Sequence, residues 1–80
     1  MDILPALVTI LADVLVIDPA FALPASDLRA DLGMDSLDSI ELGTVIDDEF
    51  NVELTDDEFA ALTTVQSLAD LITAKRPAKV

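Results

Sequence analysis

The residues with the clearest chemical potential are the serine and the two acids of the segment Asp35-Ser36-Leu37-Asp38. A serine becomes a strong nucleophile when a nearby base, most often histidine, takes its proton, and this chain contains no histidine. The only lysines, Lys75 and Lys79, lie at the far C-terminal end. Ser36 is therefore better interpreted as the acceptor of a covalent modification than as a nucleophile, and we assign no catalytic residue.

Ser36 stands where a loop is expected to turn into a helix. A helix N-terminus offers unpaired amides and a positive dipole end, which favour a phosphate on the serine. Asp35 and Asp38 oppose an incoming phosphate by like-charge repulsion, and a divalent cation between the carboxylates relieves that repulsion. Ligands that are all oxygens suit Mg²⁺. Taken alone, Asp35-Ser36 is better explained as an ordinary helix cap.

A longer segment, residues 32–42 (LGMDSLDSIEL), surrounds Ser36. It resembles the attachment site of the acyl carrier protein family, in which the serine of Asp-Ser-Leu carries 4'-phosphopantetheine. An isolated Asp-Ser-Leu is a weak signal, whereas the whole segment is specific. The resemblance extends from the first helix through Asp48-Glu49-Phe50 to Thr63-Thr64-Val65-Gln66.

The resemblance implies an all-α four-helix bundle that is not an enzyme and holds acyl groups as thioesters. Ser36 would carry the 4'-phosphopantetheine derived from coenzyme A, and Asp35 would assist its loading, with Mg²⁺ needed only then. The partners would be a phosphopantetheinyl transferase and acyl-synthesis or acyl-transfer enzymes with basic docking patches. The residues that recognise these partners would be Leu37, Asp38, Ile40, Glu41, Thr44, Asp47 and Asp48. The acyl chain would fold back between the second and third helices, against Ile46, Leu54, Phe59, Leu62 and Ile72.

The helix that begins at residue 35 or 36 has two distinct faces at 100° per residue. Its expected core face contains Leu42, Ile46 and Phe50, with Ser39 and Gly43 among them. The opposite, solvent-facing stripe contains Leu37, Glu41, Thr44 and Asp48, flanked by Asp38 and Asp47. This geometry predicts an accessible Ser36 and a packed, hydrogen-bonded Ser39.

Composition limits the other classes of function. The 80 residues suffice for one domain, residues 1–80, and 52% hydrophobic residues with only 4% aromatics favour an aliphatic helical core. A net charge of −12 argues against nucleic acid and anionic membranes and favours basic partners. The absence of cysteine and histidine excludes disulfides and the usual zinc sites. We expect no specific metal site, only weak divalent binding at Asp35 and Asp38 and at Asp47 and Asp48.

Hydrophobic spacing predicts helices over residues 2–16, 35–50, 55–62 and 64–75 and a long loop over 18–34. Asp2 is the expected cap of the first helix, whose expected core residues are Leu4, Leu7, Leu11, Val14 and Leu15. The apolar run 3–17 is interpreted as a buried helix and not as an export signal, since its N-terminal flank is acidic and it is too short to cross a bilayer. We therefore expect a cytoplasmic monomer without membrane insertion. The loop is expected to be pinned to the core by Phe21, Leu23, Leu28 and Leu32.

Local capping signals mark the last two helices. Thr55 and Glu58 form a capping box, with Leu54 and Phe59 placed as a hydrophobic staple. Thr63 or Thr64 is expected to cap the fourth helix, whose expected core residues are Val65, Leu68, Leu71 and Ile72. Lys75 and Arg76 suit its negative end, and Pro77 stops it.

Two departures from the family keep the pathway open. The first helix is far less charged than in carriers of fatty-acid synthesis, and Gly43 and Thr44 stand where those carriers often have bulky residues. The first hypothesis is a discrete carrier of fatty-acid or related acyl synthesis, and the second is a carrier for polyketide, nonribosomal peptide or aminoacyl chemistry. An acidic helical adaptor without a prosthetic group would also explain the charge. Incubation with coenzyme A, Mg²⁺ and a transferase distinguishes these classes, because an adaptor gains no mass.

Overall fold

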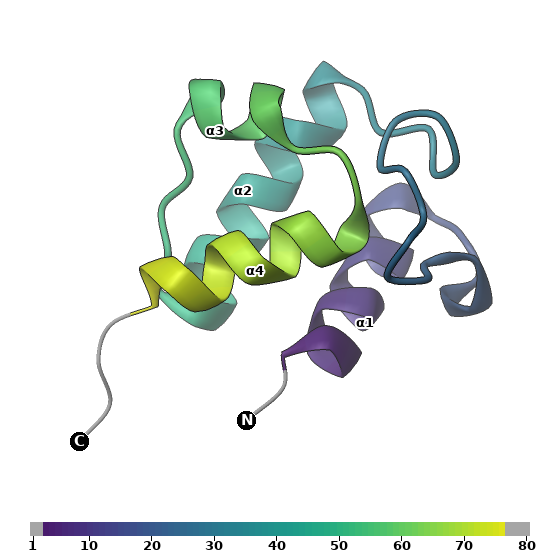
Figure 1. Cartoon of the computed structure of the whole chain (residues 1–80), viewed down its shortest axis with the longest axis horizontal. Coiled ribbons are helices and arrows are strands. Elements are labelled where there is room, and N and C mark those ends of the chain that lie inside the picture. Colours follow the sequence, from purple (N-terminus) through teal and green to yellow (C-terminus); the bar gives the residue numbers. More distant parts are fainter. Residues whose placement is uncertain (1–2, 77–80) are drawn as a thin grey trace.

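The computed structural model describes residues 3–76 and confirms the expected all-α bundle (Figure 1). Its elements are α1 (Leu4–Leu15), the 3-10 turn η1 (Pro19–Phe21), α2 (Ser36–Phe50), α3 (Asp56–Ala61) and α4 (Val65–Lys75). Among these residues no helix has both the length and the apolar character needed to cross a membrane. The first helix packs against α2, α4 and η1, and α3 lies across one end of the bundle.

The first helix begins without a side-chain cap. Ile3 is its N-cap residue, Pro5 lies in its first turn, and the expected cap Asp2 lies outside the described residues. The helix ends at Val16, which adopts a left-handed conformation (φ 56°) and is 88% exposed. A β-branched residue is rarely found there, so this turn is strained. It redirects the chain into η1.

The capping residues of α3 and α4 are those that local sequence signals favour. The Thr55 hydroxyl accepts from the Glu58 amide at 3.1 Å, and the Glu58 carboxylate accepts from the Thr55 amide at 2.8 Å. Of the two threonines considered for α4, Thr64 is the cap, and its hydroxyl accepts from the Ser67 amide at 3.1 Å. Each box satisfies amides that the first helical turn leaves unpaired.

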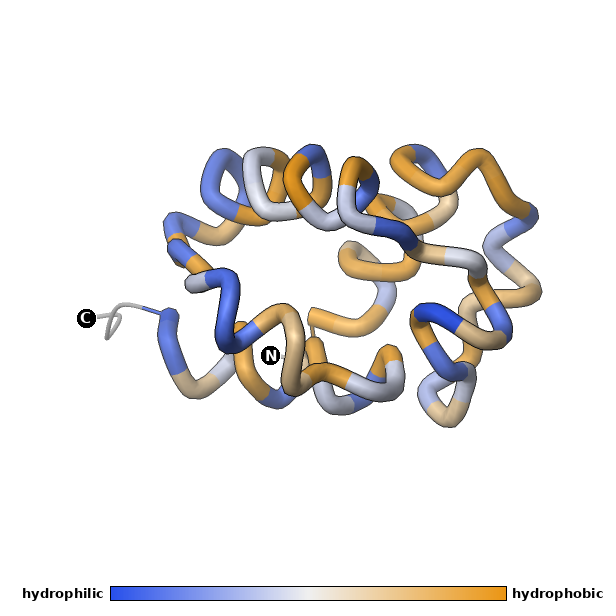
Figure 2. The backbone as a smooth tube through the Cα atoms, turned by 90° about the horizontal axis from the view of Figure 1, so that it is seen from above, coloured by the Kyte–Doolittle hydropathy of each residue, from blue (hydrophilic) through white to orange (hydrophobic). Residues whose placement is uncertain are grey.

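The core is aliphatic, with hydrophobic residues recurring along every helix (Figure 2). Leu7 and Leu11 of α1, Leu42 and Ile46 of α2, and Leu68 of α4 are completely buried. Phe59 of α3 and three further residues of α4, Val65, Ala69 and Ile72, belong to the same cluster. A single continuous core therefore includes all four helices.

The loop between α1 and α2 is fastened to the bundle by different residues from those expected. Leu28 and Leu32 are buried as predicted, but the prediction for Phe21 and Leu23 is wrong, because these side chains are 67% and 59% exposed. Ala22 points inward instead. The reason is η1, which the Ala22 amide closes by donating to the Pro19 carbonyl at 3.1 Å. The Ser26 hydroxyl then fixes the chain that follows, since it accepts from the Leu23 amide at 3.1 Å and donates to the Phe21 carbonyl at 2.9 Å.

The same loop also pairs with the connection between α3 and α4. Asp27 and Thr64 form an isolated antiparallel bridge, and the Val65 amide donates to the Ser26 carbonyl at 3.0 Å. The Gln66 amide donates to the Pro24 carbonyl at 2.9 Å. The loop therefore supplies acceptors for two amides of the first turn of α4, which a helix cannot satisfy by itself.

Candidate functional site

Asp35 is the residue that caps α2. Its carboxylate accepts from the Asp38 amide at 2.9 Å, and the Asp38 carboxylate accepts from the Asp35 amide at 3.2 Å. These reciprocal bonds form a capping box at the mouth of the helix. Both carboxylates are thus held beside Ser36 by backbone hydrogen bonds.

Ser36 is the first residue of α2 and is exposed. Among the described residues its hydroxyl has no hydrogen-bond partner. Ser39 differs, since it is half-buried and its hydroxyl donates to the Asp35 carbonyl at 3.0 Å. The Ser36 hydroxyl is therefore free in solvent, whereas the Ser39 hydroxyl is engaged in a hydrogen bond within the helix.

Ser36 opens onto a groove of about 600 Å³ between α2 and α3. This volume is in the range of small-molecule sites. On the α2 side the groove is lined by Ser36, Ser39, Ile40, Gly43, Thr44 and Asp47. Across from them lie Arg29, Glu53, Leu54, Asp56, Phe59 and Ala60. The groove thus starts at the Ser36 hydroxyl and continues over a mixed lining of polar and apolar side chains.

The five residues expected to contact an acyl chain lie at two depths. Leu54 and Phe59 line the groove. Ile46, Leu62 and Ile72 are buried in the core cluster and do not line it. A chain lying in the groove as it stands would therefore touch only the outer pair.

The residues expected to dock partners spread over the exposed side of α2. Ile40, Thr44 and Asp47 line the groove beside α3, whereas Glu41 lines a second groove of about 430 Å³ between α1 and α2. Leu37 and Ile40 are 75% and 68% exposed, although both are apolar. Asp48 is exposed, and Asp38 is half-buried by its role in the cap.

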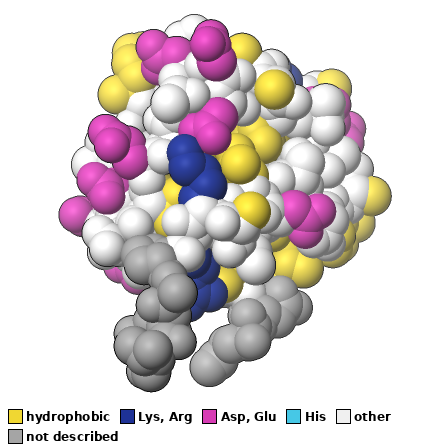
Figure 3. Space-filling view, turned by 60° about the vertical axis from the view of Figure 1, so that its left-hand side comes forward, with side chains coloured by type: hydrophobic (Ala, Val, Ile, Leu, Met, Phe, Trp, Pro, Cys, Tyr) yellow, Lys and Arg dark blue, Asp and Glu magenta, His cyan; other side chains and the backbone are white. Residues whose placement is uncertain are grey.

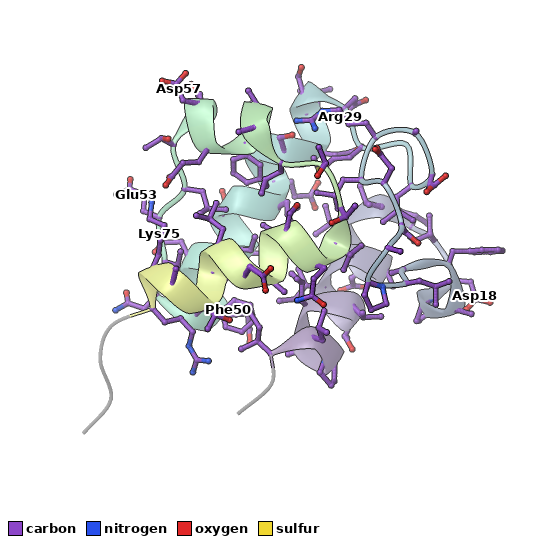
Figure 4. All side chains as sticks on the ribbon, viewed as in Figure 1. Asp18, Arg29, Phe50, Glu53, Asp57 and Lys75 are labelled. Carbon is purple, nitrogen blue, oxygen red and sulfur yellow. The ribbon has the colours of Figure 1, made fainter. Side chains whose placement is uncertain are left out.

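Two basic residues hold α3 at its ends, and sequence reasoning gave neither this role. Arg29 donates from Nη1 to the Leu62 carbonyl and from Nη2 to the Phe59 carbonyl, both at 2.7 Å. Lys75 Nζ donates to Glu58 Oε1 at 2.6 Å and to the Glu53 carbonyl at 2.7 Å. Figure 4 shows Arg29 on one side of α3 and Lys75 beside Glu53, near the connection that precedes the helix. The six-residue helix is therefore positioned by side chains from the loop and from α4.

Hydrogen bonding lowers two carboxyl pKa values near this region. The Lys75 ammonium, followed by the Thr55 amide, lowers the pKa of Glu58 below its ordinary value. The amides of Ala30 and Arg29 lower the pKa of Asp27. Both groups are thus held in their charged forms by donors that folding brings to them.

The surface around these elements is acidic, and Figure 3 shows acidic side chains spread over this face around a small basic patch. Within residues 3–76, no cluster of three acidic side chains is arranged to hold a metal ion. Asp35 and Asp38 are close enough to share their cap but form only a pair. An ion at this position would need further oxygen ligands from a bound phosphate or from water.

Comparison with known proteins agrees with this geometry. Residues 5–72 match the family described as Phosphopantetheine attachment site. The chain is also 42% identical over 74 residues to a protein of Thermosynechococcus vestitus named "Acyl carrier protein", covering 92% of this chain and 91% of that protein. These findings agree with the free serine at the start of α2 and the open groove beside it. The match covers most of the length, and the chain therefore belongs to the acyl carrier protein family.

Proposed function

We propose that Ser36 is the residue that carries 4'-phosphopantetheine in this protein. The observation that supports the proposal is the exposed hydroxyl at the start of α2, which is free because Asp35 performs the capping. The residues around it fit the group: the positive end of the α2 dipole would favour a phosphodiester at Ser36, and the groove would give room for the pantetheine and its acyl chain. When bound, the group supplies a thiol that holds acyl groups as thioesters, and the protein itself is a carrier and not an enzyme.

Loading would form a bond from Ser36 Oγ to the phosphorus of coenzyme A that bears the pantetheine. The bond from that phosphorus to the bridging oxygen of the pyrophosphate would break, and the nucleotide phosphate and the serine proton would leave. Asp35 would help to hold Mg²⁺ during this step, and the ion would offset the negative charge of the pyrophosphate of coenzyme A. The side chain already caps α2, so only part of its oxygen capacity remains for the ion. Asp35 therefore has two separable roles.

The partners would be a phosphopantetheinyl transferase and the enzymes of fatty-acid or related acyl synthesis. Their basic patches would meet the carboxylates of α2, and Leu37 and Ile40 would supply apolar contact. Leu54 and Phe59 would meet the acyl chain first, with Ile46, Leu62 and Ile72 behind them. In this function the protein acts as a cytoplasmic monomer, in the compartment that supplies coenzyme A.

Incubation with coenzyme A, Mg²⁺ and a phosphopantetheinyl transferase tests the site. Intact mass should increase by one phosphopantetheine in wild type and in Ser39→Ala, and Ser36→Ala should gain nothing while keeping its helical circular dichroism. Asp35→Asn keeps a side chain that caps helices as well as aspartate, so its thermal midpoint should stay near wild type while its loading rate falls. Mass gain by Ser36→Ala, or none by wild type, contradicts the proposal.

A further inference from the structure

The ring of Phe59 in α3 lies against Gly43 in α2. A Cβ atom placed on Gly43 would lie 3.3 Å from Phe59 Cε2 and 3.6 Å from Cζ. The first distance is shorter than the ordinary separation of non-bonded carbons, about 3.5–4.0 Å. Glycine at this position therefore lets the ring lie directly against the backbone of α2.

The ring belongs both to the groove and to the core. Phe59 lines the groove, yet it is only 8% exposed and belongs to the core cluster. Of the other four expected acyl contacts, Leu54 also lines the groove, whereas Ile46, Leu62 and Ile72 belong to the core cluster and do not reach it. Among the described residues that line the groove, Phe59 is the one that is itself buried, so its ring lies between the open groove and the aliphatic interior.

The backbone that carries the ring is fixed from both sides. Arg29 binds the carbonyl of Phe59 itself at 2.7 Å and that of Leu62, and Lys75 binds Glu58, the residue before Phe59. With both ends of α3 held, the ring can leave Gly43 by side-chain rotation, whereas displacing the helix would break charged hydrogen bonds.

We propose that Phe59 determines where this carrier places an acyl chain: its ring, seated on Gly43, closes the interior between α2 and α3 and keeps the chain in the surface groove. The apolar groove residues Ile40, Leu54 and Ala60 then cover one side of the chain, and its other side remains accessible to partner enzymes. The inference rests on the proposed function, since the chain must be attached at Ser36. Phe59 then determines whether the attached acyl chain stays exposed in the groove or becomes enclosed in the core.

The test uses protein loaded from octanoyl-coenzyme A by a transferase, with intact mass confirming one octanoyl arm. In wild type, nuclear Overhauser contacts from the chain protons should reach the methyl groups of Ile40 and Leu54. They should be absent from the methyl groups of Ile46, Leu62 and Ile72. Phe59→Leu removes the ring and should make contacts to these three buried residues appear.

Phe50→Leu is the matched control, because it removes the ring of a half-buried phenylalanine at the end of α2, outside the groove. Its chain contacts should equal those of wild type. If Phe59→Leu loses its helical circular dichroism, Phe59→Met, which keeps a larger flexible side chain, takes its place. Contacts to the buried trio in wild type, or none in a folded, loaded Phe59 variant, overturn the inference. A protein that gains no octanoyl mass contradicts instead the proposed function.

Discussion

At Ser36 the chain keeps a hydroxyl in solvent by giving the capping of α2 to the preceding residue. A serine at the cap position itself would spend its oxygen on a helix amide. Here Asp35 and Asp38 satisfy each other's amides, and Ser36 follows the cap with its side chain unused. Asp35 therefore serves the proposed modification even before any metal ion is considered.

Charge reversal on the exposed side of α2 tests whether its acidic residues dock partner enzymes or only contact solvent. Glu41→Lys with Asp48→Lys should lower the association rate with a basic partner on the order of tenfold at low salt, because long-range attraction steers the encounter. Added salt should slow wild type and reduce the difference, since these carboxylates are exposed. Stopped-flow association with the transferase at two ionic strengths measures both effects.

Leu37→Ala is the uncharged counterpart. Leu37 is 75% exposed, so its loss should weaken binding to a similar extent at low and high salt. An unchanged association rate for the charge-reversed protein at low salt would mean that the acidic side of α2 is only a solvated face.

At the scale of single elements, α3 depends most on its surroundings. A helix of six residues is not stable alone, and this one is held by its own capping box, by Phe59 in the core and by the two basic side chains. Arg29 and Lys75 thus contribute much of the stabilisation of α3. Their removal should loosen α3 without unfolding the bundle.

Arg29→Ala should raise hydrogen exchange of the α3 amides roughly fivefold or more, as expected from losing charged hydrogen bonds that contribute about 1 kcal/mol. The amides of α1 and of the middle of α4 should change less, because α3 can open locally. Arg76→Ala removes the same charge at the end of α4, where no side-chain hydrogen bond is described, and serves as the control. Equal acceleration in all helices would show that Arg29 supports the whole fold instead.

Acidification should weaken the contact between Glu58 of α3 and Lys75 of α4. The pKa of Glu58 is lowered in the folded protein by Lys75 and the Thr55 amide. Its stabilisation is therefore complete above its ordinary value of 4.5 and is lost as the pH falls through the lower, folded value. The difference in unfolding free energy between wild type and Glu58→Gln, from urea titrations, should shrink as the pH falls below 4.5. A constant difference would argue against the ion pair.

Features of these elements that depend on neighbouring residues can be predicted from the sequence, whereas contacts between distant segments cannot. Neighbouring residues predict Thr55 as the cap of α3, a cap for α4 at Thr63 or Thr64 and a start of α2 at residue 35 or 36, and hydrophobicity predicts the burial of Leu28 and Leu32. The roles of Arg29 and Lys75 cannot, since their acceptors lie far along the chain and no periodicity records such contacts.

The exposure of Phe21 and Leu23 escapes prediction for a similar reason. Hydrophobicity alone does not show which side chain a 3-10 turn directs inward. The cue available in the sequence is Asp18-Pro19, an acidic cap followed by proline, which indicates a turn of this kind.

On the scale of the whole molecule, the net charge of −12 sits on a body of 36 × 24 × 19 Å. Mutual repulsion of the carboxylates opposes compaction when little salt is present. A domain of this size also has a small stability margin. The acidic surface that we propose for partner docking therefore has a cost in stability.

Divalent ions should relieve that repulsion. At low ionic strength, millimolar Mg²⁺ or Ca²⁺ should raise the thermal midpoint by several degrees, which corresponds to about 1 kcal/mol in a domain of this size. The two ions should act alike, because the described residues contain acidic pairs and no metal cluster. Monovalent salt at higher concentration should reproduce part of the effect. A midpoint unmoved by either ion would mean that repulsion does not limit stability.

The bridge between Asp27 and Thr64 has a consequence for the order of folding. It joins segments separated by nearly half of the chain, and a single isolated bridge offers little to offset the entropy of closing so long a loop before the helices have packed. The helices and their first contacts should therefore form in the folding transition state, and the bridge should form after it. A late contact of this kind mainly slows unfolding and has little effect on the rate of folding. The loop that leads to Ser36 would then act as a kinetic lock, retaining the native state once the rest of the bundle has assembled.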